Sequence, residues 1–158
     1  MAPRAAARLE LLGFGDIYEY KPGKLDWMAA GLPTEGENAT KGRAGTVARK
    51  DVPLCELGER LGDVADRVHG IGWEAVVVVD EHRVVLGLLR APELAKDPEL
   101  SIEQAMRPGP STFRPYVLVQ EMARYMTEHN LESSPITTLD GKLVGLLFRA
   151  DAVREGGG

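Results

Sequence analysis

The stretch Ala75–Glu93, AVVVVDEHRVVLGLLRAPE, decides the fold of this 158-residue chain. It opens with the valine run Val76–Val79, and a continuous β-branched run predicts a strand that is buried on both faces. A polar turn at residues 80–83 leads into a second apolar run, Val84–Leu89, so we expect the two runs to form a hairpin. Gly87 interrupts the returning strand, and a glycine there usually marks the close approach of another backbone or a ligand.

The same pattern returns later in the chain. The segment Ser134–Asp151, SPITTLDGKLVGLLFRAD, again has two apolar runs, joined by an Asp-Gly turn that strongly favours a hairpin. Gly-Leu-Leu at residue 87 recurs 58 residues later at residue 145, and the same shift keeps the apolar positions in register. It also pairs Arg49 with Arg107, Ala65 with Ala123, Glu74 with Glu132 and Glu93 with Asp151. An internal repeat of this kind predicts two copies of one structural unit.

The bulk properties exclude several classes of protein. A composition of 44% hydrophobic and 27% charged residues is ordinary for a soluble globular protein. The net charge of −5, without a Lys/Arg-rich run, argues against a nucleic-acid partner. The apolar runs are too short to cross a membrane, and the amino end lacks the apolar core of a secretory signal. The single cysteine excludes an internal disulfide and fits a reducing compartment. We therefore expect a cytoplasmic protein with neither nucleic-acid nor membrane partners.

Local patterns predict the remaining elements. Apolar residues at helical spacing indicate one helix over 57–71 and another over 118–130, with Asn130 as its left-handed end. Ser101 and Gln104 form a capping-box pattern for a short helix. The order of elements divides the chain into an amino-terminal segment (1–33), a polar linker (34–45), a first repeat (46–100) and a second repeat (101–158).

The repeated order of strand, helix, hairpin and short helix resembles a tandem pair of CBS domains, named after cystathionine β-synthase. The segment RPGPSTFRP at 107–115 is similar to that family's Met-x-Pro-x-Pro-x-Thr-Val opening. The segment Ser134–Asp151 is similar to its close, Pro-Val-Val-Asp…Gly…Leu-Val-Gly-Ile-Ile-Thr…Asp. The resemblance covers about residues 46–154 and implies an α/β (α+β) fold. Two β-α-β-β-α repeats would pack sheet to sheet about a pseudo-twofold axis, because one unit cannot cover its own sheet.

The resemblance also implies a ligand site at the close of each repeat, which in the family has the form Gly-h-h-Ser/Thr-x-x-Asp, where h is apolar. The glycine admits the ligand, the aspartate accepts hydrogen bonds from ribose hydroxyls, and the hydroxyl side chain lies near the ribose or phosphates. Neither repeat keeps the hydroxyl, and only the second keeps the aspartate. The corresponding residues are Gly87, Arg90 and Glu93 in the first repeat and Gly145, Phe148 and Asp151 in the second.

Each of these residues also has a plainer interpretation. Asp151 would stabilise the start of the last helix, worth roughly 0.3–1 kcal/mol. Arg90 would neutralise a phosphate or lie exposed after its strand, and Phe148 would stack on a base or, as we favour, plug the site. The residues Ser134, Pro135 and Ile136 would line an adenine slot or serve as core strand.

The expected ligand is an adenosine-containing molecule, namely AMP, ADP, ATP or S-adenosylmethionine. We expect its ribose to meet Asp151 and Asp151→Ala to leave the fold nearly unchanged, since this residue begins a terminal helix. No catalytic or metal-binding pattern emerges, because the three histidines share no metal spacing and Cys55 fits a small core residue. A homodimer is expected, with Leu61, Val68, Met122 and Tyr125 as candidates for either core or interface.

Residues 4–33 resemble a second family. The runs RAAARLELLGFGDIY and KPGKLDWMAAGLP are similar to the carboxyl end of a rhodanese-like domain, whose active-site loop carries a nucleophilic cysteine. No cysteine lies near this segment, so the resemblance brings no chemistry with it. Three functions follow as alternatives. The chain is a non-enzymatic regulatory CBS pair, part of a sulfurtransferase whose catalytic cysteine lies upstream, or a structural dimerisation module with inactive sites.

Overall fold

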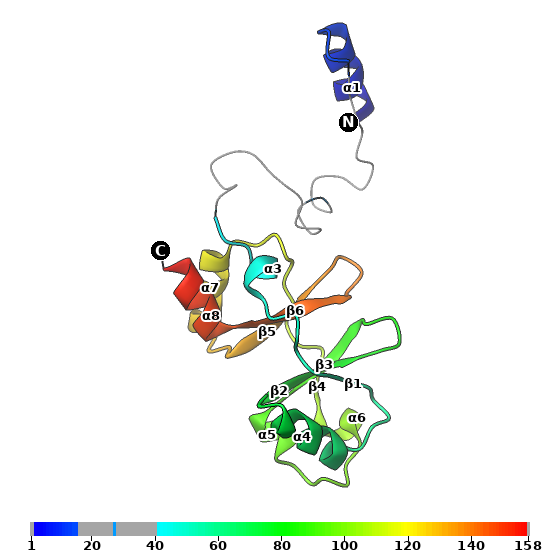
Figure 1. Ribbon diagram of the computed structural model, residues 1–158, viewed down its shortest axis with the longest axis vertical. Coiled ribbons are helices and arrows are strands. Elements are labelled where there is room, and N and C mark those ends of the chain that lie inside the picture. Colours follow the sequence, from blue (N-terminus) through cyan, green and yellow to red (C-terminus); the bar gives the residue numbers. More distant parts are fainter. Residues whose placement is uncertain (1, 16–26, 28–40, 158) are drawn as a thin grey trace.

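The computed structural model describes residues 2–15, 27 and 41–157, and its elements are shown in Figure 1. The helices are α1 (Ala2–Leu11), α3 (Ala44–Val47), α4 (Leu61–Gly70), α5 (Ala91–Leu94), α6 (Ile102–Ala105), α7 (Val119–Glu128) and α8 (Arg149–Gly156). The strands are β1 (Leu54–Cys55), β2 (Ala75–Val79), β3 (Val85–Arg90), β4 (Arg107–Pro108), β5 (Ser133–Thr137) and β6 (Leu143–Phe148). Most of the segment 4–33, for which the sequence resembles a rhodanese-like domain, lies outside the described residues.

Each repeat is built on the hairpin that the sequence predicts. Strands β2 and β3 pair antiparallel, β1 lies parallel to β2, and β4 lies antiparallel to β3, which gives the order β1-β2-β3-β4. The second repeat has the hairpin β5–β6 with single bridges in place of the outer strands, Phe113 to Ile136 and Arg49 to Leu146. The 58-residue shift maps these bridges onto β1 and β4. The two sheets therefore share one plan.

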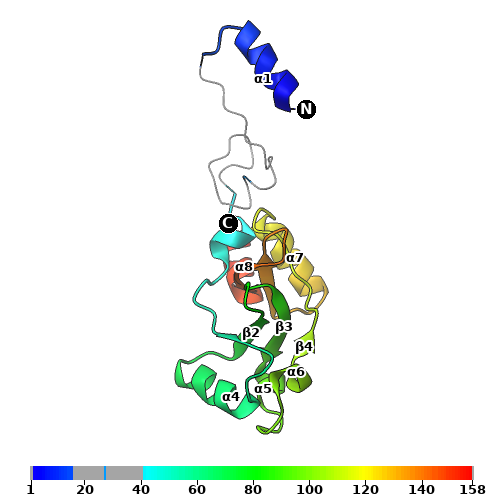
Figure 2. The same cartoon turned by 90° about the vertical axis from the view of Figure 1, so that its right-hand side faces the viewer.

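The outermost strand of each sheet comes from the segment that leads into the other repeat. We call residues 43–53 and 101–111 the lead-in segments. The backbone of Arg49 exchanges two hydrogen bonds with Leu146, each 2.9 Å long, and α3 packs beside α7 and α8 of the second repeat (Figures 1 and 2). Reciprocally, β4 in the second lead-in segment pairs with β3 of the first repeat. Each lead-in segment thus pairs with the repeat opposite to the one that it precedes in the chain.

The repeated glycines make this exchange sterically possible. A Cβ atom at Gly145 would lie 2.7 Å from the Arg49 carbonyl oxygen, closer than real Cβ contacts. A Cβ atom at Gly87 would lie 2.3 Å from the Met106 sulfur and 3.1 Å from the Arg107 carbonyl oxygen. The sequence left open whether a backbone or a ligand approaches these glycines, and in the structure the opposite lead-in segment comes close to both.

Three apolar clusters hold the fold together. One lies inside each repeat, and the third lies between the two sheets. The valine run Val76–Val79 is fully buried, as predicted, with alternate residues facing the first-repeat cluster and the inter-sheet cluster. Leu61, Val68 and Met122 belong to the core rather than to a free surface, whereas Tyr125 is partly exposed. The cluster between the sheets consists of Val52, Ala75, Val77, Val79, Leu88, Leu143 and Leu146.

The two hairpins also meet at their tips. Val85 N–H donates to the Gly141 carbonyl, and Leu143 N–H donates to the Arg83 carbonyl, at 3.1 and 2.9 Å. Gly141 has a φ of 83°, as the expected Asp-Gly turn requires. Together with the shared cluster, these contacts confirm two repeats packed sheet to sheet about a pseudo-twofold axis.

One local prediction needs correction. Helix α4 starts at Leu61 rather than at residue 57, because Leu61 N–H donates to the Leu100 carbonyl and residues 57–60 turn before the helix. Between Pro110 and Pro115, Phe113 alone forms a β-bridge, since proline cannot donate to a ladder. Helix α8 extends to Gly156.

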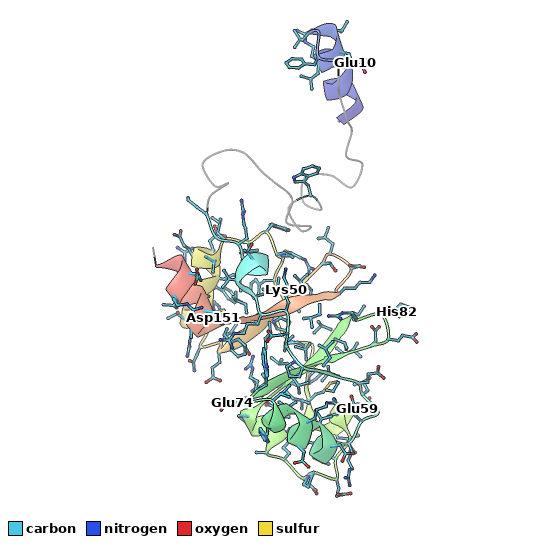
Figure 3. All side chains as sticks on the ribbon, viewed as in Figure 1. Glu10, Lys50, Glu59, Glu74, His82 and Asp151 are labelled. Carbon is cyan, nitrogen blue, oxygen red and sulfur yellow. The ribbon has the colours of Figure 1, made fainter. Side chains whose placement is uncertain are left out.

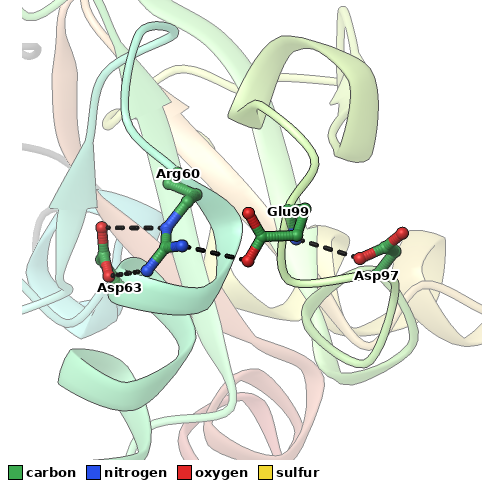
Figure 4. Close-up of polar contacts among 4 residues, drawn as sticks. All are labelled: Arg60, Asp63, Asp97 and Glu99. Atoms are coloured by element: carbon green, nitrogen blue, oxygen red, sulfur yellow. Dashed lines mark hydrogen bonds and ion pairs between the residues drawn. The ribbon is translucent and has the colours of Figure 1, made fainter.

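An exposed charge network fastens the loop before α6 to the start of α4. The Arg60 guanidinium bonds to Asp63 at 2.9 Å and to Glu99 at 3.0 Å, and the Glu99 N–H donates to Asp97 (Figure 4). Next to this network, Ser101 and Gln104 form the predicted capping box. All four charged residues are well exposed, so each pair contributes little to stability.

Candidate functional site

A cavity of about 340 Å³ lies where the two repeats meet. It takes Leu88 and Arg90 from β3 of the first repeat and Leu131 and Ser133 from the second repeat. The second lead-in segment supplies the rest of the wall, which is Arg107, Pro108, Gly109, Pro110 and Ser111. We call it the arginine cavity. Because both repeats contribute to it, the cavity exists only when they are packed together.

Arg90 ends β3 and precedes helix α5. Its terminal guanidinium nitrogen donates to the Ser133 carbonyl at 3.1 Å, so this side chain links the two repeats. The Arg90 Nε atom is buried and has no hydrogen-bond partner among the described residues. A buried donor without a partner costs free energy, so the packing of the two repeats holds this side chain at some cost.

Glu93 lies behind the cavity wall. Its side chain is 10% exposed, and Oε2 accepts a hydrogen bond from the Arg90 N–H at 3.0 Å. Its Oε1 atom faces the Arg107 Nε atom at 3.4 Å, and the Arg107 side chain is 66% exposed. The carboxylate at the position of the family's ribose-binding acid is therefore paired loosely with a solvent-exposed arginine.

Asp151 is held far more tightly. Its side chain is 5% exposed at the start of α8 (Figure 3), and each of its carboxylate oxygens faces an arginine. Arg49 Nε donates at 2.8 Å, and Arg154 lies at 3.0 Å. The hydrogen bond from Arg49 is the main reason that the pKa of Asp151 lies below its ordinary value, although burial opposes the shift. Asp151 is not among the residues that line the arginine cavity.

Phe148 lies against the same arginine. The Arg49 guanidinium carbon is 4.9 Å from the Phe148 ring centroid and 5.9 Å from the Trp73 ring, and the two rings lie 6.0 Å apart. We call these three side chains the aromatic stack. Its geometry is that of a cation over aromatic rings, which is attractive. Of the two interpretations of Phe148, these contacts favour the plug.

The 58-residue shift relates the aromatic stack to the arginine cavity. Arg49, Trp73 and Phe148 correspond in order to Arg107, Leu131 and Arg90, which all line the cavity. The two faces of the pseudo-symmetric pair therefore differ: where one presents two arginines and a leucine around a hollow, the other presents two aromatic rings packed on one arginine.

The residues expected to form an adenine slot lie in β5. Ser134 is buried, and its hydroxyl donates to the carbonyl of Ser111 at 2.8 Å. The Pro135 carbonyl accepts from the Phe113 N–H, and Ile136 belongs to the second-repeat core. None of the three lines the arginine cavity, whereas their neighbour Ser133 does.

The structure thus separates the predicted site residues into two groups. Arg90 and Glu93, with Gly87 near the same lead-in segment, belong to the cavity side, whereas Phe148 and Asp151 belong to the stack side. The sequence interpretation missed Arg107, Ser111, Leu131 and Ser133. The available signal was the pairing of Arg49 with Arg107 under the shift, which places a cation at the same point of both lead-in segments.

The other chemically reactive side chains that the structure describes form no site. Cys55 is 2% exposed and belongs to the core, as predicted, and burial raises the pKa of its thiol to about 12. It is therefore inert at neutral pH. His82 lies at the tip of the β2–β3 hairpin (Figure 3) and His129 stacks on Tyr125. Within residues 2–15, 27 and 41–157, no His, Cys, Asp and Glu group has the arrangement of a metal site. Within the same ranges, no helix has the length and apolar character needed to span a bilayer.

Comparison with known proteins finds one family match and several solved structures with a similar fold. Residues 101–158 match the CBS domain family. CBSX2 in complex with AMP superposes with a TM-score of 0.65 at 20% identity, over 72% of this chain and 94% of that one. The CBS domain pair of protein MJ0100, in complex with 5′-methylthioadenosine and S-adenosyl-L-methionine, gives 0.66 at 19%, over 74% and 97%. The cytosolic domain of the Mg²⁺ channel MgtE in complex with ATP gives 0.65 at 22%, over 72% of this chain and 48% of that one.

These matches agree with the resemblance stated from the sequence for residues 46–154. The chain therefore has the fold of the solved CBS-domain pairs.

Proposed function

We propose that this protein is a non-enzymatic regulatory module that binds an adenosine-containing nucleotide in the arginine cavity. The observation that carries the proposal is the cavity itself, built from both repeats and lined by two arginines and two serines. Three solved structures with the same fold are complexes with AMP, with ATP, or with 5′-methylthioadenosine and S-adenosyl-L-methionine. A cleft with a few convergent polar groups is the usual form of a small-molecule site.

The chemistry of the side chains that line the cavity suggests which part of the ligand each would contact. The apolar side chains of Leu88 and Leu131 suit the faces of an adenine ring, and the hydroxyls of Ser111 and Ser133 suit its polar edge. For the ribose hydroxyls we propose Glu93, because it lies beside the cavity and one of its oxygens is only loosely paired. Asp151, which the sequence favoured for this role, has both oxygens engaged by arginines and does not line the cavity.

The proposal is tested by thermal unfolding and calorimetry with AMP, ADP, ATP and S-adenosylmethionine. A ligand that binds only the folded state at a hundred times its Kd stabilises it by about 2.7 kcal/mol. At least one of the four should raise the unfolding temperature and titrate with one site per chain. If none does, the module is not an adenosine-nucleotide binder, and the structural alternative with inactive sites stands in its place.

The other expectations belong to the same proposal. We propose a cytoplasmic homodimer, and sedimentation showing only a monomer at tens of micromolar would contradict it. Leu61, Val68 and Met122 are core residues and so do not contribute to the dimer surface. The rhodanese-like resemblance of residues 4–33 remains a prediction. Transfer of sulfur from thiosulfate by this chain would favour the sulfurtransferase alternative over the regulatory one.

A further inference from the structure

The arginine cavity carries more positive than negative charge. Arg90 and Arg107 are its charged lining residues, and among the described residues the only carboxylate paired with either side chain is Glu93, on Arg107. The Glu93 contact with Arg90 is made to the backbone N–H rather than to the guanidinium. The cavity therefore presents two positive charges to a ligand, and the negative charge of Glu93 balances them only in part.

Arg90 has donor capacity that the protein does not use. One terminal nitrogen donates to the Ser133 carbonyl, which orients the guanidinium plane, and Nε is buried without a partner in the described part of the chain. A guanidinium offers its donors as a planar fork that matches two oxygens of a phosphate. A phosphate in the cavity would meet the terminal nitrogens of Arg90 rather than Nε, which is buried.

The backbone of Arg107 is fixed, and its guanidinium is only loosely paired. Its backbone is fixed by the pairing of β4 with β3, while its side chain is 66% exposed and 3.4 Å from Glu93. Exposed ion pairs of this kind contribute little. The Arg107 guanidinium can therefore turn from Glu93 to an anion at a small cost in free energy. This turn would also release the Glu93 carboxylate for the ribose.

From these observations we infer that the arginine cavity selects adenosine ligands that carry a 5′-phosphate over those that carry none. Arg90 at the position of the family's hydroxyl residue provides the main contact, and Arg107 provides a second. The inference deepens the proposed function and rests on it. A sulfonium ligand such as S-adenosylmethionine would bring a positive charge toward two guanidinium groups and is disfavoured for the same reason.

The decisive experiment compares AMP with 5′-methylthioadenosine, which has the same base and ribose but no phosphate. Calorimetry on the whole chain should show AMP binding at least about tenfold tighter, the worth of one charge-assisted hydrogen bond. Arg90→Gln should weaken AMP about ten- to a hundredfold and leave 5′-methylthioadenosine within about twofold. Arg90→Lys keeps the charge and should recover part of the loss. Arg49→Gln, which corresponds to Arg107 under the 58-residue shift, is the control for the loss of an arginine that does not line the cavity, and it should change neither affinity.

Salt dependence gives a second measurement that needs no variant. Raising the salt concentration screens charges, so AMP should weaken while 5′-methylthioadenosine stays constant. This arm remains valid if Arg90→Gln fails to fold for want of its bond to Ser133. Equal affinities with equal salt dependence, or a folded Arg90→Gln that binds AMP normally, would overturn the selection and leave the proposed function standing. Binding of neither ligand nor of ATP would overturn both.

Discussion

The arginine cavity and the aromatic stack occupy equivalent places in the two repeats, yet they differ in almost every property that matters for binding. Both are framed by a Gly-Leu-Leu strand and by a lead-in segment from the opposite repeat. Three pairs of side chains differ, namely Arg90 and Phe148, Leu131 and Trp73, and Glu93 and Asp151. The comparison shows that the repeat duplicates a backbone frame, while a few side chains decide whether that frame holds a cavity or a packed contact.

The two ion pairs differ in the same sense. Arg49 donates to Asp151 at 2.8 Å and stacks on aromatic rings, and Arg154 holds the second oxygen. Arg107 lies 3.4 Å from Glu93, and its guanidinium has no aromatic contact in the described part of the chain. The first arrangement ties α8 to the first lead-in segment, and the second leaves its two charges available.

The largest effect on stability should come from filling the space at the repeated glycines. Gly145→Ala places a methyl group 2.7 Å from a backbone carbonyl oxygen that cannot move without breaking the Arg49–Leu146 bridge. We expect it to lower the free energy of unfolding by about 1–3 kcal/mol, measured by urea denaturation. Gly87→Ala is the matched control. Its closest contact is the Met106 side chain, which is pliable, so its cost should be smaller. A larger loss for Gly87→Ala would contradict this view of the exchange.

Removing the buried carboxylate should have the next largest effect. Asp151→Asn leaves two arginines without their partner, and we expect a loss of about 1–2 kcal/mol in urea denaturation. This is less than the roughly 3–5 kcal/mol of a fully buried pair, because the Arg49 and Arg154 side chains are 51% and 68% exposed. Glu93→Gln should cost clearly less. If both substitutions cost the same, the two ion pairs are equivalent and the comparison fails.

That prediction differs from an expectation drawn from the sequence, that Asp151→Ala leaves the fold nearly unchanged. It followed from the place of Asp151 at the start of a terminal helix, where only local contacts are visible. Arg49 lies 102 positions away and reaches Asp151 because its lead-in segment crosses to the second repeat. The structure revises the expectation for that reason.

Other features were within reach of the sequence. The 58-residue shift identified the repeated hairpins, the two glycines and the pairing of Arg49 with Arg107 and of Glu93 with Asp151. It did not reveal that each arginine faces the acid of the opposite repeat, because periodicity within a repeat carries no information about which copy a lead-in segment joins. The same limit hid Ser133 and Leu131, whose role depends on the packing of β3 from the first repeat against them.

Acid should weaken the molecule through Asp151. The hydrogen bond from Arg49 lowers the pKa of this carboxyl in the folded state, so the unfolded chain binds a proton more readily than the folded one. The resulting stabilisation is present at pH values above the ordinary carboxyl pKa of about 4 and is lost as the pH falls through the lower folded value. Unfolding midpoints measured from pH 7 downward should drop in this range.

Asp151→Asn should remove part of that drop, and its midpoints should approach those of the wild type at the most acidic pH. The exposed residues Asp63 and Asp140 also have pKa values below the ordinary one, through hydrogen bonds from Arg60 and Thr138 respectively. Some acid sensitivity should therefore persist in the variant. An unchanged pH profile would mean that the Arg49 contact does not bias the protonation of Asp151.

The smallest effect concerns the aromatic stack. The sign of a coupling free energy should distinguish the stack from the arginine cavity. A double-mutant cycle of Arg49→Gln and Phe148→Leu should give a favourable coupling of about 0.5–1 kcal/mol, because the guanidinium lies 4.9 Å from the ring centroid. The cycle subtracts the Arg49–Asp151 contact, because Arg49→Gln removes it equally with Phe148 present and in the Phe148→Leu background. The equivalent cycle of Arg107→Gln and Arg90→Leu joins two like charges and should give a coupling near zero or of opposite sign. Saturating AMP should turn that second coupling favourable, since one phosphate would then bind both arginines, whereas the first coupling should not change. Couplings of the same sign on both faces, with and without AMP, would show that the side-chain differences between the repeats have no consequence for binding.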